Sequence, residues 1–109
     1  MKDLLNKKCV PCEGGVIPLS GSDLQDYLDE VHTWVLSTDA KDISKEFKFK
    51  NFLESMDFVD RVADIAEEEV HHPDIHIHYN KVTLDLSTHA INGLSENDFI
   101  LAKKIDVML

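Results

Sequence analysis

The spacing of hydrophobic residues changes at Pro73, and this change constrains the fold more than any other feature of the chain. Apolar residues recur at three- and four-residue steps over 52–70, the period of an amphipathic helix. Apolar and polar residues then alternate over 75–79 and 82–89, the period of strands with one covered face. Because proline disfavours helical geometry in the residue before it, we expect the helix to end near residues 71–72.

The other elements follow from similar patterns and from their capping residues. Ser22, Asn51 and Ser95 each precede an apolar helical pattern and are good N-caps, and Glu54 completes a capping-box spacing with Asn51. The predicted order is a helix at 23–31, strands at 34–36 and 43–50, the helix from Phe52, strands at 75–79 and 82–89, and a helix after Ser95. Short hairpins imply antiparallel pairing, and each strand has one apolar face. We therefore predict an α+β fold, a four-stranded antiparallel sheet with helices packed on one face, in the order α-β-β-α-β-β-α.

Length and composition indicate one folded domain with an N-terminal arm. The chain has 109 residues, which suits a single domain. Residues 1–21 hold three of the four glycines and two of the three prolines. We expect this segment to be a loosely structured arm, and residues 22–109 to be the domain.

The net charge of −10 disfavours two classes of partner. Binding to nucleic acid and to anionic membrane surfaces depends on basic side chains, and this chain has no basic stripe. It also lacks an apolar run of 18 residues and an apolar segment at its start of the kind found in signal peptides. We expect a cytoplasmic protein that binds neither nucleic acid nor membrane.

Cys9 and Cys12 have the Cys-x-x-Cys spacing of a redox pair or of half a zinc site. A second cysteine pair is absent, and prolines and glycines surround the motif where a redox motif would open a helix. We favour a reduced, non-catalytic pair in the arm.

Five of the six histidines lie within 71–89, and the hairpin suggests how they could meet. A two-residue loop at 80–81 would place His72 opposite His89, at the open end of the hairpin. Histidine can donate or accept a proton near neutral pH because its reference pKa is about 6.5.

Several of these histidines and the nearby carboxylates have alternative roles that the sequence leaves open. His76 and His78 lie on the polar face of their strand and need no function, although with a third histidine they could bind zinc. Glu67 lies one helical turn before His71 and could orient its ring. Asp98 follows Ser95 by three residues, so its simplest role is to cap the last helix.

The spacing of these residues, taken together, resembles one protein family. Glu67 is followed after three residues by His71-His72-Pro73, after five more by Tyr79, after nine by His89 and after eight by Asp98. This pattern is similar to the signature of the pterin-4a-carbinolamine dehydratases, and a weaker resemblance extends from about Leu24 to the C-terminus.

The resemblance implies an α+β fold and a lyase activity without metal or organic cofactor. Family members dehydrate 4a-hydroxytetrahydrobiopterin, the product left by an aromatic amino acid hydroxylase, to the quinonoid dihydropterin in tetrahydrobiopterin recycling. By position, His71, His72 and His89 would be catalytic, with Glu67 and Asp98 supporting them.

Three further expectations concern the alternative function, the oligomeric state and the substrate. Relatives of this fold also act as protein partners, so a non-catalytic pterin-binding, coactivator or assembly module is the alternative function. The resemblance and the exposed edges of a four-stranded sheet both favour a homodimer or homotetramer. Ile75 stands where many family members have an aromatic residue, which would alter how a pterin stacks.

Overall fold

The computed structural model describes residues 3–10 and 17–109, and its element order confirms the predicted fold class. The elements are η1 (Leu4–Asn6), α1 (Gly21–Glu30), β1 (Val35–Leu36), β2 (Ile43–Lys48), α2 (Phe52–Glu69), β3 (Asp74–His78), β4 (Lys81–Leu86), η2 (His89–Ile91) and α3 (Glu96–Val107). Two short 3-10 helices, η1 and η2, are the only additions to the predicted order in the described part of the chain. In that same part, no helix is both long enough and apolar enough to cross a membrane.

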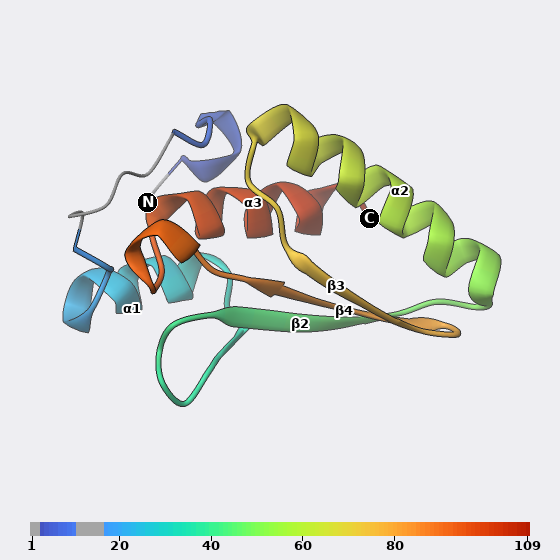
Figure 1. The fold of residues 1–109 in the computed structure, drawn as a ribbon, viewed down its shortest axis with the longest axis horizontal. Helices are drawn as coiled ribbons and strands as arrows, with labels where there is room; N and C mark the ends of the chain where they lie inside the picture. Colours follow the sequence, from blue (N-terminus) through green and yellow to red (C-terminus); the bar gives the residue numbers. More distant parts are fainter. Residues whose placement is uncertain (1–2, 11–16) are drawn as a thin grey trace.

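The four strands form one antiparallel sheet in the order β1-β2-β4-β3, and the helices lie on one side of it (Figure 1). The alternating apolar residues of β4, one of the two inner strands, are fully buried in a core cluster that also includes residues of α2 and α3. Large, fully buried members of this core include Ile43, Phe58, Leu84, Leu86, Phe99, Leu101 and Ile105. Strand β3 forms an edge of the sheet, and its Ile75 and Ile77 each remain 36% exposed.

Helix α2 begins as predicted and ends two residues earlier than predicted. The Asn51 side chain accepts a hydrogen bond from the Glu54 N–H (2.9 Å), whereas the Glu54 carboxylate accepts from the Lys50 N–H (3.0 Å) and not from the N-cap residue. At the other end Val70 adopts a left-handed conformation, with φ 52°, and the His71 N–H donates to the Ala66 carbonyl (3.1 Å). The His71 bond is the 6→1 bond of a Schellman motif, and the Val70 N–H donates to the same Ala66 carbonyl. The helix therefore ends before it reaches Pro73.

The hairpin register differs from the prediction by two residues. His78 pairs with Lys81, so the loop is Tyr79–Asn80 and not 80–81. Asn80 is bound to the chain beyond β2: its side chain donates to the Phe49 carbonyl (3.2 Å), and its own carbonyl accepts from the Phe49 N–H (2.8 Å). A shift of two residues keeps every side chain on its predicted face.

The predicted strand over 82–89 is also too long, because β4 ends at Leu86. Thr88 then forms an isolated bridge with Gly93, and His89 begins η2. The predicted pairing of His72 with His89 across the hairpin is therefore wrong, since neither residue lies in a strand.

The division into an arm and a domain at residue 21 stays a prediction, but the described part of the arm is well packed. Leu4 in η1 is buried within the same core cluster as the helices and the sheet. Figure 1 shows η1 beside the C-terminal end of α2 and close to α3. Residues 3–10 are therefore docked on the fold rather than loosely structured. Cys12 lies outside the described residues.

Candidate active site

Asp98 is the centre of the candidate site, and the first turn of α3 places it. Ser95 caps the helix: its hydroxyl accepts from the Asn97 N–H (3.3 Å), while its own N–H donates to the Asp98 carboxylate (3.0 Å). This reciprocal arrangement is the capping box that the spacing predicts. The Asp98 side chain is fully buried, so its position is set by the helix terminus and by its other hydrogen bonds.

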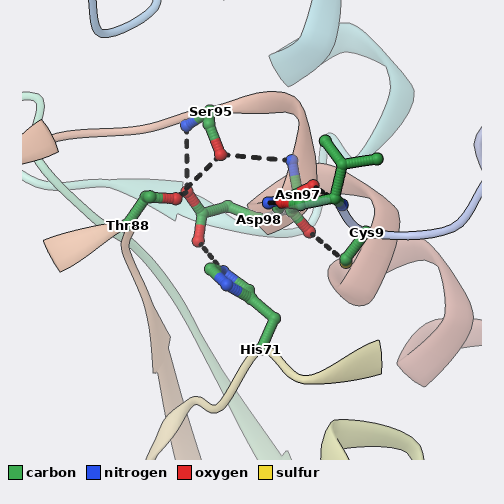
Figure 2. Close-up of polar contacts among 7 residues, drawn as sticks. Cys9, His71, Thr88, Ser95, Asn97 and Asp98 are labelled. Atoms are coloured by element: carbon green, nitrogen blue, oxygen red, sulfur yellow. Dashed lines mark hydrogen bonds and ion pairs between the residues drawn. The ribbon is translucent and has the colours of Figure 1, made fainter. Parts of the chain in front are cut away.

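Two more donors converge on the Asp98 carboxylate from other segments (Figure 2). His71, in the turn after α2, places its Nε2 2.6 Å from Oδ1, and the Thr88 hydroxyl donates to Oδ2 over 2.8 Å. Together with the Ser95 N–H, three donors meet two carboxylate oxygens. A buried carboxylate is tolerated only when it is hydrogen-bonded in this way.

This geometry determines which nitrogen of His71 carries the proton. An ionised carboxylate can only accept hydrogen bonds, so the Nε2 of His71 must be the donor. In the neutral ring Nδ1 is then the nitrogen with a lone pair, available to accept a proton. The ring is largely buried, with 12% of the side chain exposed, and the hydrogen bond to Asp98 fixes its orientation. A histidine held by a buried carboxylate is an arrangement typical of acid–base catalysis.

His72 has a different and more open environment. Its Nε2 lies 2.5 Å from the Glu67 carboxylate, and both side chains are more than half exposed. The hypothesis that Glu67 orients His71 is therefore wrong, because the helix ends at Glu69 and the left-handed Val70 turns His71 toward α3. An exposed pair of this kind contributes little to stability and leaves His72 accessible to a ligand.

His89 is exposed and follows Thr88, whose hydroxyl contacts Asp98. Asp98 thus links His71 to the segment that carries His89, although no hydrogen bond joins the two rings among the described contacts. Sequence reasoning noted the stretch Ser87-Thr88-His89 as family-like but gave Thr88 no role in the site. Its position directly before His89, a candidate catalytic residue, was the feature of the sequence that could have indicated a role for it.

The remaining histidines on the hairpin lie on the exposed sheet face. His76 is paired with Asp85 at 2.9 Å, and His78 lies opposite Lys81 in the register. Across residues 3–10 and 17–109, no three histidine, cysteine, aspartate or glutamate side chains are grouped so as to hold a metal ion. The zinc alternative built on His76 and His78 therefore has no third ligand in that part of the chain.

Residues 17–108 match the sequence model of the pterin 4 alpha carbinolamine dehydratase family. The chain belongs to this family. Relatives assigned to the pterin-4-alpha-carbinolamine dehydratases include one from Halorhodospira halophila, 48% identical over 105 residues that cover 96% of each chain. Another, from Nitrosospira multiformis, is 48% identical over 106 residues, covering 97% of this chain and 92% of the relative.

Two solved structures share the dehydratase fold. A protein from Brucella melitensis described as a transcriptional coactivator/pterin dehydratase superposes with a TM-score of 0.79 at 32% identity, over 84% of this chain and 97% of that one. A pterin dehydratase-like protein described as a RuBisCO assembly factor in the alpha-carboxysome gives 0.62 at 24% identity, over 72% and 92% of the two chains. The second likeness shows the fold alone.

Proposed function

We propose that this chain is a 4a-hydroxytetrahydrobiopterin dehydratase that works by histidine acid–base catalysis. The reaction breaks the C4a–O bond: the hydroxyl leaves as water after it is protonated, and a ring nitrogen loses a proton to give the quinonoid dihydropterin. Family membership supports the substrate class. The observation that carries the mechanism is the hydrogen bond from His71 to the buried Asp98.

In this proposal His71 is the base and His89 is the acid. The carboxylate of Asp98 orients the His71 ring and stabilises the imidazolium that forms when Nδ1 takes the proton. His89 is exposed and adjacent to Thr88, so it can approach the leaving hydroxyl without displacing a partner found among the described residues. His72, paired with Glu67 at the surface, would hold the substrate.

A turnover assay tests the proposal directly. A hydroxylase supplies 4a-hydroxytetrahydropterin, and formation of the quinonoid product is followed against the uncatalysed dehydration. We expect clear acceleration by the wild-type chain that survives extensive chelation, near-complete loss in His71→Ala, and no change in His78→Ala. A wild-type rate equal to the spontaneous rate would reject the enzyme, and a rate that chelation abolishes and zinc restores would reject the metal-independent mechanism.

The alternative function is a protein-partner module on the same fold, and one feature favours it. Strand β3 is an exposed edge whose Ile75 and Ile77 are only partly covered, and such edges commonly pair with another chain. The Brucella melitensis protein is itself described as both a coactivator and a dehydratase. The turnover assay separates the alternatives, because a module without catalysis would leave the spontaneous rate unchanged. We also propose that the protein is cytoplasmic and that it forms a homodimer or a homotetramer.

A further inference from the structure

The segment Lys7–Val10, which we call the strap, lies between the two elements that position His71 and Asp98. On one side the Cys9 N–H donates to the Glu69 carboxylate (2.8 Å), at the end of α2. On the other side Val10 binds Asn97 in the first turn of α3. Glu69 is two residues before His71. Asn97 directly precedes Asp98, and Figure 2 shows it between Cys9 and Asp98. The strap therefore bridges the two chain segments whose separation sets the His71–Asp98 hydrogen bond.

Glu69 is a charged side chain in a buried position, so the groups that bind it affect the stability of the fold. Its side chain is 3% exposed, and a buried carboxylate is costly unless it is paired and hydrogen-bonded. Lys104 of α3 supplies the ion pair (2.9 Å), and the strap supplies the second donor through Cys9. Burial alone would raise the pKa of Glu69, but the Cys9 N–H and the Lys104 ammonium outweigh it and hold that pKa below its usual value.

Asn97 binds the strap through both ends of its amide. The Val10 N–H donates to Oδ1 (3.0 Å), and Nδ2 donates to the Val10 carbonyl (2.6 Å). The Asn97 side chain is buried, whereas Val10 itself is exposed, so the backbone of the strap and not the packing of the valine makes this contact. The Cys9 thiol also donates to the Asn97 carbonyl (3.5 Å).

The contacts of the Cys9 thiol also bear on its own chemistry. Burial, with the nearby Glu69 carboxylate, raises the pKa of the thiol to about 12. Thiolate is therefore scarce at neutral pH, and the thiolate is the reactive form of cysteine. The arrangement suits a structural role for Cys9 rather than a nucleophilic or redox one.

We propose that Glu69 and Asn97 are positioning residues for the dehydration, and that they act through the strap to hold His71 against Asp98. The inference rests on the proposed function for its catalytic consequence, but its structural content does not depend on turnover. Neither residue touches the substrate in this scheme. Loss of either contact lets the end of α2 and the start of α3 move relative to each other, and a displacement of about 1 Å at a catalytic group can cost about a hundredfold in rate.

The test uses variants that remove contacts of the strap, with neighbours of the same type as controls. Glu69→Ala also removes the ion pair with Lys104, whereas Asn97→Ala and Val10→Pro act on the strap without touching that pair. Glu69→Ala is compared with Glu68→Ala, an exposed glutamate on the same helix, and Asn97→Ala with Asn6→Ala, an exposed asparagine bonded to Asp3. Val10→Pro removes a single N–H donor at an exposed residue and should leave the fold intact. Glu69→Gln keeps an oxygen for the Cys9 N–H and serves as the conservative rescue.

Two measurements are made on each variant: kcat and KM, and the NMR resonance of the His71 Nε2 proton. We expect Glu69→Ala, Asn97→Ala and Val10→Pro to lower kcat about tenfold or more with KM within about twofold, and to broaden or shift the Nε2 proton. Controls should match the wild type, and Glu69→Gln should recover most of kcat.

Folded Val10→Pro and Asn97→Ala with unchanged kcat and an unchanged resonance would overturn the positioning role. If the wild type itself shows no turnover, the proposed function fails. The resonance alone then decides whether the strap fixes the His71–Asp98 pair.

Discussion

Replacing Asp98 by asparagine should disable His71 while leaving the protein folded. The three donors divide between the two carboxylate oxygens, with Ser95 and Thr88 on Oδ2 and His71 on Oδ1. An amide has one acceptor oxygen. If that oxygen keeps the bonds to Ser95 and Thr88, the amide nitrogen faces His71, and the ring can bond to it only by accepting through Nε2. The proton of the neutral ring then moves to Nδ1, which can no longer act as a base.

The expected magnitudes follow from what is lost and what is kept. The helix cap and the Thr88 bond survive, and one charge-assisted hydrogen bond is weakened, so we expect stability to fall by about 1–3 kcal/mol. A tautomer inverted in this way lowers kcat by about 10⁴ in the serine-protease precedent, and we expect a loss of about 10³–10⁴ here. Asp98→Ala removes the acceptor of all three donors, so its stability loss should be larger, about 3–6 kcal/mol.

Three measurements on Asp98→Asn test this reasoning. Thermal unfolding by circular dichroism gives the stability change, nitrogen chemical shifts of the His71 ring give the tautomer, and steady-state kinetics give kcat. A folded variant whose ring has the proton on Nδ1 and whose kcat stays within about tenfold of the wild type would refute His71 as the base.

Four other predictions follow from the same structure. His89→Ala should lower kcat by about 10²–10⁴-fold and His72→Ala should mainly raise KM, with His78→Ala as the neutral control. Equal, small effects in steady-state kinetics at all three positions would contradict the histidine mechanism. Val70→Gly should raise the melting temperature, because the valine is exposed and its left-handed φ of 52° is strained; a lowered melting temperature would show that this strain is absent. Because the pKa of Glu69 is depressed on folding, its contribution to stability is complete above the unfolded pKa and declines as pH falls through the folded pKa. The stability difference between wild type and Glu69→Gln, measured by urea titration, should thus shrink on acidification, and a constant difference from pH 7 to pH 3 would contradict the shift. Light scattering at micromolar concentration should report a dimer or tetramer, and a 12.4 kDa monomer would contradict association through an exposed sheet edge such as β3.

The fold could be predicted from sequence because its signals are local. The period of three to four residues over α2 and the alternation over β3 and β4 define the elements, and Asn51 and Ser95 mark where two helices begin. The hairpin register could not be predicted, because it depends on a contact between Asn80 and Phe49, which are 31 residues apart in the chain. Turn preferences alone favoured a loop at 80–81.

Which residues form the catalytic site stays a prediction, and two of the contacts expected among them were wrong. The spacing from Glu67 to Asp98 selected the candidate side chains, but helical geometry paired Glu67 with His71, and a hairpin paired His72 with His89. Both inferences assumed that regular structure continues to residue 72 and to residue 89, and the structure interrupts it before each. The left-handed Val70 is the main cause at the first point, and nothing in a valine indicates that conformation in advance.

Asp98 caps helix α3, and this role alone would explain its position in the sequence, yet it also belongs to the candidate site. A capping aspartate needs one backbone N–H, which Ser95 provides, and its second oxygen would ordinarily face water. Here that oxygen is buried and bonded to His71, while Thr88 adds a third donor. The helix cap therefore fixes the carboxylate in advance, and the histidine ring is held by a group that cannot rotate away. The same carboxylate thus belongs to the helix cap and to the candidate catalytic pair. The spacing between Ser95 and Asp98 predicts the cap, but it gives no indication of the contact between Asp98 and His71.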